Sequence, residues 1–537
     1  MAGDVSQVPQ GVRSGAASFR AASLGAEPSR GAPRAASAPA ASSRVASSRA
    51  ASSRAASSRA ASSRAVLSRA LAVPLVVALV ALLPGYVLIQ PGPGQRDAGF
   101  WLQLALTCYA GARLCAMALG RRRRLLQGAF WLFCYVAMGV APLAQEVIGQ
   151  VPTPVVGPRS DTVLAISLTL LGCVAYDVGA FAARLQPPRD SPRPPRPPAQ
   201  VARRRLWLLV LLAYAGSALC IAKLGGPAVF FTSRQDISET VQASGLTGSS
   251  GESHVGSAFI RGFGTVPALL ALLVLIRWMA TSQRARRNLP ALVALCGLAV
   301  INVIVNNPIS NPRYWFLTVV FAILFTVFPR SPAVYRTALV GGVVAALLLF
   351  PFLDRFRYDA GGYHPVQSTS VLDPLTIKDY DQVGMFANTL SYVESGAGHT
   401  HGRHLAADVF FFVPRSVWHG KPLDSGVVVG RWMGMTNTNL SSPLWAELWL
   451  DFGPLGMTAG FLLIGYASSR ADLRYARRTL ESPRPGTLAA VVTPLAAGYS
   501  FILLRGPLLQ AAGRIGILLL CVALVATTSR DPRRALR

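Results

Sequence analysis

Long apolar segments recur along this chain, and they constrain its fold more than any other feature of the sequence. A helix of about 20 apolar residues is long enough to cross the roughly 30 Å hydrocarbon layer of a bilayer. The chain has 537 residues, of which 52% are hydrophobic, and yet it carries a formal net charge of +29. That combination excludes an ordinary soluble globular protein. It indicates a membrane protein whose charges lie between the apolar runs.

Twelve apolar runs fit a membrane-spanning helix. They occupy residues 71–90, 98–119, 126–148, 161–185, 206–223, 259–280, 289–305, 314–328, 337–353, 443–467, 487–504 and 508–527. The predicted fold is therefore an all-α polytopic membrane protein with about twelve transmembrane helices. Residues 354–442 form a long polar interruption between the ninth and tenth spans.

The distribution of arginine predicts how the spans are oriented. Arginine-rich connections follow every second span, for instance RRRR at 121–124, SQRARR at 282–287 and SRADLRYARR at 469–478. Lys and Arg gather in the cytoplasmic loops of membrane proteins. We therefore expect a multi-pass protein with both termini in the cytoplasm and with residues 354–442 on the outer side.

The first 70 residues are of low complexity, and the pentapeptide ASSRA repeats in them. A period of five fits neither helix nor strand, and the Ala/Ser/Arg composition cannot bury a core. We predict a disordered, basic, cytoplasmic tail that serves as a spacer or touches anionic lipid. The other predicted divisions are 71–353 with spans one to nine, 354–442 as the extracytoplasmic loop, 443–528 with spans ten to twelve, and 529–537 as a cytoplasmic tail.

The orientation rule leaves the arginines of the outer side unexplained. Arginine binds phosphate through two parallel hydrogen bonds and keeps its charge in a poorly hydrated site, so these residues suggest an anionic substrate. For any single arginine, reaching to lipid headgroups or pairing with an acid of the same loop is an equally good alternative. The arginines at or just under the outer face are Arg234, Arg261, Arg313, Arg355, Arg357, Arg403, Arg415 and Arg505, together with Arg514 in the last span.

Two of these arginines have the most informative surroundings. Arg313 follows the turn NNPISNP at 306–312, whose prolines and asparagines favour a rigid connection. Arg415 follows the apolar run 405–413, which is too short to span a bilayer and is typical of an interfacial or re-entrant helix. Trp418 and Lys421 come directly afterwards, so this helix would present cations at headgroup depth.

The remaining polar groups offer acids, bases and a possible metal site. Asp381, with Asp379 and Asp373 as neighbours, could accept a proton from a sugar hydroxyl, although solvated carboxylates are common on loops. We expect Glu447 to be buried and paired, with an outer arginine as its candidate partner. A metal at His399, His401, His404 and Asp408 is disfavoured, because their spacing matches no recognised motif.

Other cofactor classes find no support either. The chain has no P-loop and no nucleic-acid-binding motif, and we expect no nucleotide-sugar chemistry. Its seven cysteines fall inside the apolar runs without zinc-like spacing. We expect no cofactor, no metal and no nucleic-acid partner.

Three segments resemble a known family. SNPRYWF at 310–316, FFFVPRSVWHGKP at 410–422 and SSPLWAELWLDFGPLG at 441–456, with the long loop between the first and second, are similar to the Wzy-type oligosaccharide repeat-unit polymerases (O-antigen polymerase-like proteins). The resemblance covers residues 306–456 by motif and the rest of the membrane region by topology. The N-terminal tail is not part of it.

The resemblance implies a GT-C-like glycosyltransferase of the bacterial cytoplasmic membrane. Such proteins join oligosaccharide units carried on undecaprenyl diphosphate at the outer face, without metal or nucleotide sugar. The implied partners are the lipid-linked oligosaccharide, membrane lipids, and a chain-length regulator and flippase of the same pathway. Arg313 and Arg415 match the family's motifs.

The sequence thus yields a ranked set of site residues and three competing functions. The expected catalytic residues are Arg313, Arg415, Asp381 and Glu447, and the expected substrate-binding residues are Lys421, Arg403, Arg234, Arg505, His404 and Trp418. A ligase that transfers finished glycan would share these residues. A flippase would suit twelve spans, but the two halves show no internal repeat. An envelope scaffold would not need arginines at the outer membrane boundary.

Overall fold

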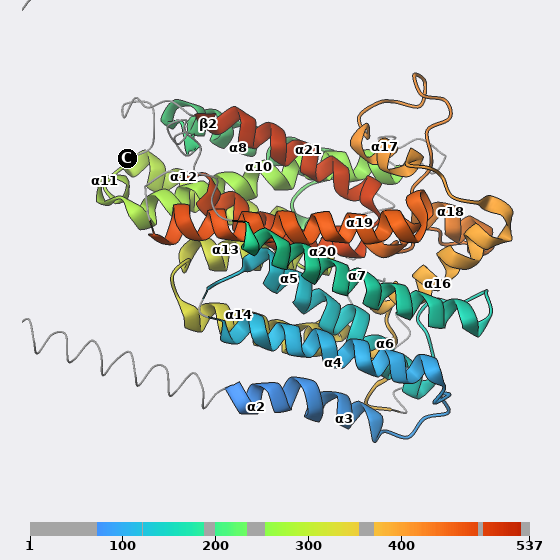
Figure 1. Ribbon diagram of the computed structural model, residues 1–537. Coiled ribbons are helices and arrows are strands. Elements are labelled where there is room, and N and C mark those ends of the chain that lie inside the picture. The colour runs from blue at the N-terminus through green and yellow to red at the C-terminus, as the bar shows by residue number, and fades with distance from the viewer. Residues whose placement is uncertain are drawn as a thin grey trace, which may run out of the picture. The chain divides into compact units, whose positions relative to one another are not determined.

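The computed structural model describes residues 72–120, 122–186, 199–232, 253–353, 370–481 and 487–527, and of residues 72, 253–260, 480 and 481 it describes the backbone alone. The predicted tail 1–70, Arg234, the first part of the long loop and the predicted C-terminal tail lie outside the described residues. The described chain is mostly helical (Figure 1). A short antiparallel pair joins β1 (Gln200–Val201) to β2 (Ala526–Thr527), with Gln200 opposite Thr527.

The helices follow one another along the chain in this order. The first third contains α2 (Ala72–Val76), a π-helical turn (Val77–Leu82), α3 (Leu83–Leu88), α4 (Ala98–Leu119), α5 (Leu125–Phe133), a π-helical segment (Cys134–Val140), α6 (Ala141–Ile148) and α7 (Arg159–Leu185). The middle contains α8 (Arg203–Lys223), a 3-10 turn (Ala228–Phe231), α10 (Ser253–Thr281), α11 (Gln283–Arg286), α12 (Leu289–Val305), α13 (Arg313–Val327), α14 (Pro332–Val344), a π-helical turn (Ala345–Leu349) and α15 (Phe350–Leu353).

The last third begins with the described part of the long loop. It contains two 3-10 turns (Asp373–Thr376 and Lys378–Tyr380), α16 (Gln382–Tyr392), a π-helical turn (Val393–Ala397), α17 (Arg403–Val409) and α18 (Ser425–Trp432). The helices α19 (Leu444–Tyr475), π-helical Ala476–Glu481, α20 (Ala489–Arg505) and α21 (Leu508–Val525) follow.

Eight helical segments of the described chain are long and apolar enough to cross a membrane. They are Ala98–Leu119, Leu125–Ile148, Arg159–Leu185, Arg203–Lys223, Arg261–Thr281, Pro332–Leu353, Leu444–Thr479 and Leu508–Val525. Four shorter apolar helices, Val73–Leu88, Leu289–Val305, Arg313–Val327 and Ala489–Arg505, lie where the sequence predicts the other four spans. The mostly helical, membrane-embedded class is therefore confirmed, and the number of twelve crossings stays a prediction.

The starts of these helices have local chemical causes. Asn288 and Ser331 each accept a hydrogen bond from the backbone N–H three residues on, and a proline stands in the first turn of α12 and of α14. Asp97 caps α4 in the same way through the N–H of Phe100. Each side chain satisfies one of the N–H groups that a helix leaves unpaired at its N-terminus.

The helix formed by α5 and α6 is enclosed by its neighbours, and almost all of its residues are buried. Phe130 on this helix stacks on Tyr176 of α7 with ring centroids 3.6 Å apart. Trp445 of α19 lies next to them and donates its indole N–H to the Thr169 carbonyl over 3.2 Å. This aromatic group ties α5, α7 and α19 together.

The contact between α7 and α19 depends on glycine. A Cβ added at Gly179 would lie 2.0 Å from the Leu462 carbonyl oxygen, and one at Gly465 would lie 2.0 Å from the Tyr176 carbonyl oxygen. The two backbones therefore touch, as in membrane helix pairs that use small residues at their interface.

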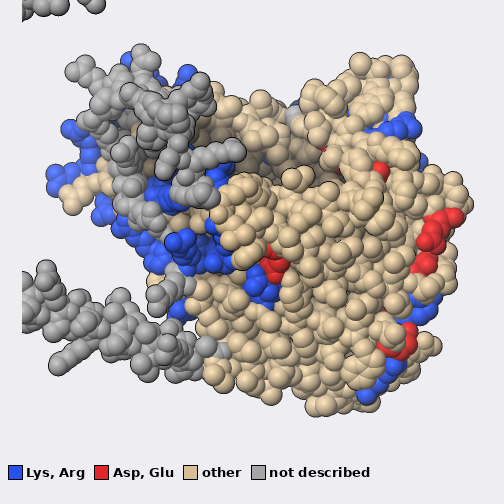
Figure 2. Space-filling view, viewed as in Figure 1, with Lys and Arg blue, Asp and Glu red and all other residues tan. Residues whose placement is uncertain are grey.

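The two ends of the helices carry different charges. We call the end where α4 meets α5 and α10 meets α11 the basic end, and the end that carries α16 and α18 the loop end (Figure 1). Lysine and arginine gather at the basic end, whereas the loop end shows acidic groups together with some basic ones (Figure 2). A basic pocket at the first of these ends is lined by Arg122, Arg123, Arg124, Arg184, Arg470 and Arg477.

Candidate functional site

The connection before Arg313 is held together by asparagine side chains. Asn307 accepts hydrogen bonds from the N–H groups of Ile309 and Ser310 at 3.0 and 2.8 Å, and its amide donates to the Phe230 carbonyl at 2.9 Å. Asn311 donates to the Val305 carbonyl at 2.8 Å. These bonds fix the backbone that leads into α13, whose first residue is Arg313.

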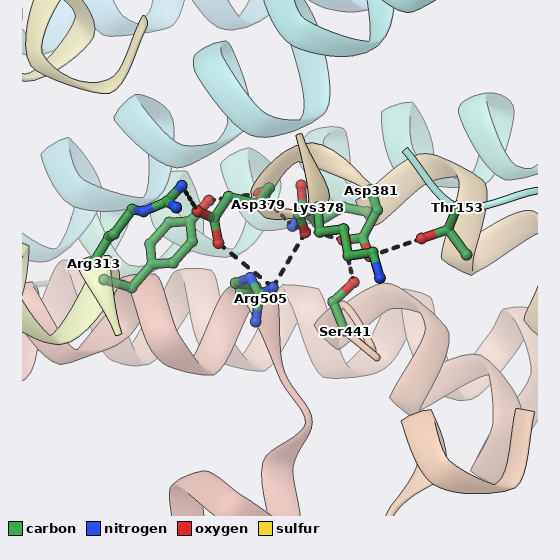
Figure 3. A network of polar contacts seen from close by, with 9 residues as sticks. Thr153, Arg313, Lys378, Asp379, Asp381, Ser441 and Arg505 are labelled. Carbon is green, nitrogen blue, oxygen red and sulfur yellow. Dashed lines mark hydrogen bonds and ion pairs between the residues drawn. The ribbon is translucent and has the colours of Figure 1, made fainter. Parts of the chain in front are cut away.

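Arg313 and Arg505 share one carboxylate at the loop end (Figure 3). Arg313 is buried and donates to the Asp379 carboxylate, and Arg505 Nη2 lies 3.7 Å from the other oxygen of the same group. Arg505 also donates to the Lys378 carbonyl over 3.3 Å. The two arginines start α13 and end α20, so Asp379 joins two apolar helices to the long loop.

Tyr314 completes this group. Its hydroxyl donates to the Asp379 carbonyl at 3.0 Å, and the Arg505 guanidinium lies over its ring at 5.6 Å. The aromatic face restricts where the Arg505 guanidinium can lie, and the hydroxyl bond restricts the backbone at Asp379. The result is two fixed positive charges facing one negative charge in a partly dehydrated place.

Asp381 lies two residues further on, and two hydroxyl groups hold it. Ser441 donates to its Oδ1 at 2.5 Å and Thr153 to its Oδ2 at 3.3 Å, and the side chain is buried (Figure 3). Donors on both oxygens hold the Asp381 side chain in place, so it ties the long loop to Thr153 and Ser441. Ser442 follows Ser441 in the chain. A Cβ added at Gly506 would lie 1.6 Å from the Ser442 carbonyl oxygen, so the turn after Arg505 lies directly against this loop.

Arg415 and Lys421 form a second cationic group, and both side chains donate hydrogen bonds to backbone carbonyls. Lys421 donates to the carbonyls of Phe410, Phe411 and Val413 at 3.1, 2.8 and 3.0 Å. Arg415 donates to the carbonyls of Lys421 and Pro422. These bonds hold the segment after α17 in shape, so both cations have a structural task.

The helix expected over 405–413 is placed differently. α17 begins at Arg403 and ends at Val409, before the three phenylalanines. Phe410 and Phe412 are exposed, which suits a segment at a membrane surface. The shift has a physical reason: Asp451 of α19 accepts the N–H groups of His404 and Leu405 at 3.1 and 2.7 Å, so a residue distant in sequence caps the helix start.

Glu447 is buried as expected, and a hydroxyl group and a backbone N–H of the described chain donate to its carboxylate. Its carboxylate accepts the Ser425 hydroxyl at 2.5 Å and the Leu508 N–H at 3.2 Å. Leu508 is the first residue of α21, so the charge lies at a helix N-terminus. Glu447 therefore joins α18, α19 and α21.

A group of acids surrounds Glu447. Asp408 of α17 has a buried carboxyl whose Oδ2 has no hydrogen-bond partner among the described residues. Burial, and then the charges of Glu447, Asp424 and Asp451, raise the pKa of Asp408 to about 9. Burial also raises the pKa of Asp424, the cap of α18, to about 7.

The other predicted site residues are placed as follows. His404 is buried, and burial lowers its pKa. Arg403 is exposed and donates to the Gly420 carbonyl at 3.0 Å. Trp418 is half-buried, and Arg234 lies outside the described residues. Among the described His, Cys, Asp and Glu side chains, no three are grouped so that they could hold a metal ion.

The structure thus brings Arg313 and Arg505 together and puts Arg415 and Lys421 into another group. Asp379 is the partner that sequence reasoning missed, because 66 residues separate it from Arg313. Its position in DPLTIKDYDQ showed only a carboxylate on a loop. Comparisons of the chain with protein-family models, curated proteins and solved structures found no match.

Proposed function

We propose that this protein polymerises oligosaccharide repeat units carried on undecaprenyl diphosphate, at the outer face of a bacterial cytoplasmic membrane. The arginine pair of Arg313 and Arg505 on Asp379 is the observation that supports it most. Two guanidinium groups, fixed at the ends of membrane helices, suit a diphosphate located where a lipid headgroup would be.

The gathering of arginine at the basic end supports the same proposal. Twelve crossings with the basic end in the cytoplasm would follow the positive-inside rule and put the loop end outside. The site would then lie in a compartment without ATP, where the donor sugar must arrive already activated. A lipid diphosphate supplies that activation. The exposed Phe410 and Phe412 would bring the loop to the bilayer surface.

The reaction that we propose is a displacement at a sugar carbon. A hydroxyl oxygen of one lipid-linked unit forms a bond to the anomeric carbon of the other chain, and the bond from that carbon to the diphosphate breaks. The diphosphate leaves with the electron pair, and Arg313 and Arg505 stabilise its growing charge. The arriving diphosphate would replace Asp379 on the arginines, and the released carboxylate would accept the hydroxyl proton.

Deletion of the protein tests the function itself. We expect single repeat units to accumulate on the carrier lipid at the outer face, while long polysaccharide disappears. Lipid extracts and surface glycan are compared by mass spectrometry and gel electrophoresis. Units retained on the cytoplasmic side would instead indicate a flippase, and polymer remaining on the lipid would indicate a ligase. Either result would contradict the proposal.

A double variant separates the role of the Arg313–Asp379 pair in the reaction, in which both residues would take part, from its role in folding. Arg313→Ala leaves Asp379 with a weaker partner, and breaking a buried pair costs about 3–5 kcal/mol, so lost polymer could reflect misfolding. Arg313→Ala/Asp379→Ala removes both charges, and we expect protein level and unfolding temperature to recover while polymer stays absent. The exposed Arg431→Ala on α18 is the control for lost charge.

One result would contradict a role of Arg313 and Asp379 in the reaction. Normal polymer in the double variant would show that the pair only holds the loop. We expect Arg313→Lys to restore little polymer, since lysine lacks the planar fork that binds two phosphate oxygens.

A further inference from the structure

The basic pocket is large enough to hold a ligand. It lies between the connection from α4 to α5, the end of α7 and the end of α19. Its volume is about 230 Å³, whereas a cavity needs only about 10–15 Å³ to hold one water molecule. The pocket therefore has room for a phosphate or a diphosphate together with some of its water. Besides its six arginines, its walls are mostly polar, so an apolar ligand would gain little there.

Asp472 of α19 is the one acid among the described residues that line the basic pocket, and it is hydrogen-bonded to α5. Its carboxylate accepts the backbone N–H groups of Leu126 and Gln127 at 3.1 and 3.2 Å, and the side-chain amide of Gln127 at 3.2 Å. It thus satisfies the N-terminus of α5. Within the described chain it forms no ion pair with an arginine. Six positive charges therefore line a pocket that holds one negative charge.

Two of the six arginines donate to neutral groups of the protein. Arg184 of α7 donates to the side-chain oxygen of Gln127 at 2.5 Å. Arg123 donates to the Pro329 carbonyl at 3.0 Å and to the Arg330 carbonyl. In the part of the chain that the structure describes, the guanidinium groups of the other four form no hydrogen bond and no ion pair, and these are Arg122, Arg124, Arg470 and Arg477. Their donors are available to an anion.

The position of Arg124 shows that helix ends alone do not account for this group. Arginines near the ends of α7 and α19 are favourable there, because the C-terminus of a helix carries a partial negative charge. Arg124 directly precedes α5, where the partial charge is positive and a cation is unfavourable. Arg124 and Arg470 are also half-buried, so their charges are less hydrated than those on an open loop. An anion in the pocket would stabilise both.

We propose that the basic pocket binds a phosphate group, with Arg124 and Arg470 as its principal ligands. The guanidinium of arginine presents N–H groups in a planar fork that fits two phosphate oxygens. The source is the headgroup of an anionic phospholipid or a free diphosphate, which share this chemistry. Basic pockets between membrane helices bind anionic headgroups in this way. The pocket lies at the end opposite to the group of Arg313, Arg505 and Asp379, so the proposal does not depend on the proposed reaction.

Binding to the purified full chain tests this proposal. The protein in neutral detergent is titrated with inorganic diphosphate by calorimetry, and with phosphatidylglycerol and diacylglycerol by native mass spectrometry. We expect diphosphate, phosphatidylglycerol or both to bind, and the apparent Kd to rise about tenfold or more in Arg124→Gln and in Arg470→Gln. Tenfold corresponds to about 1.4 kcal/mol, which one hydrogen bond between charged groups can supply. The compound whose affinity falls identifies the source of the phosphate. Diacylglycerol lacks a phosphate and should not distinguish the variants.

Arg474→Gln is the matched control. Arg474 is exposed on α19 and does not line the basic pocket, so this change removes the same charge from the same end of the molecule. We expect Arg474→Gln to bind like the wild type. Without ligand, Arg124→Gln should unfold at the same or a higher temperature than the wild type, because the change removes one of several like charges. Unchanged affinity of Arg124→Gln and Arg470→Gln for both phosphate compounds would overturn the proposal. So would an equal loss in Arg474→Gln, or no binding of either compound to the wild type.

Discussion

Asp408 is the residue whose protonation should be most visible in the stability of the whole protein. Its carboxyl is buried beside Glu447, Asp424 and Asp451, and its pKa is raised to about 9 from 3.8. The folded state therefore holds a proton that the unfolded chain releases near pH 4. Such a group contributes stability that is complete below the unfolded pKa and is lost as pH rises through the folded pKa.

We accordingly expect the unfolding temperature to fall as pH rises from about 4 to about 9. Asp408→Asn keeps the shape of the protonated acid but cannot lose a proton, so the slope should become smaller, most clearly between pH 7 and 9. Thermal unfolding in detergent at several pH values measures it. The exposed Glu394→Gln is the control. Equal slopes in wild type and Asp408→Asn would contradict the assignment.

At the scale of single residues, the sequence singled out polar residues that make specific contacts in the structure, but it did not predict their contact partners. Arg313 was singled out from a turn rich in proline and asparagine, and the structure indeed builds that turn from asparagine hydrogen bonds. Lys421 was singled out from its motif, yet its ammonium binds three carbonyls. Contacts of this kind depend on how a loop folds back on itself, which spacing does not encode. Arg505 was placed among the substrate-binding residues, and its contact with Asp379, which is far away in the chain, was not predicted.

Among the elements, the α7–α19 pair makes the sharpest test of packing. Gly179 and Gly465 allow backbone contact, and any larger side chain would push the helices apart. We expect Gly179→Leu to destabilise the protein by about 1–3 kcal/mol or more, because overpacking in a close-packed interior costs this amount. Protein level in membranes and unfolding temperature in detergent are the measurements.

Gly341→Leu is the matched control for that change. Gly341 lies on α14, where nothing is within 4 Å of an added Cβ. The same glycine-to-leucine change there should leave both measurements close to the wild type. Similar losses in both variants would show that the added leucine itself, and not contact between α7 and α19, governs the effect.

The positions of the helices could be predicted because each long apolar run of the sequence forms a helix. The run 98–119 matches α4 residue for residue, and the predicted seventh and last spans coincide with α12 and α21 to within two residues. The predicted start of α17 was wrong because Asp451 of another helix accepts hydrogen bonds from its first turn. The helix therefore begins at Arg403. Apolar periodicity is local information, whereas a cap supplied by another helix is tertiary.

For the whole molecule, the separation of charge between the two ends carries the argument about orientation. The arginines of the basic pocket gather at one end, while Asp379, Asp381 and the acids around Glu447 belong to the other. A membrane protein with this distribution should keep its basic end in the cytoplasm. Eight helices satisfy the length of a span outright, so the four shorter ones decide whether the ends alternate as proposed.

Labelling of single cysteine variants at exposed positions tests whether the ends alternate in this way. Gln95, before α4, and Asn437, before α19, both lie at the loop end, and the twelve-span arrangement puts eight crossings between them. We expect Gln95→Cys and Asn437→Cys to react with a membrane-impermeant maleimide in intact cells. Arg478→Cys at the basic end should react only after permeabilisation, and the wild type, whose cysteines lie within helices, gives the background. If α12 or α13 alone failed to cross, Gln95 and Asn437 would label on opposite sides, and the outward position of the arginine pair would have to be abandoned.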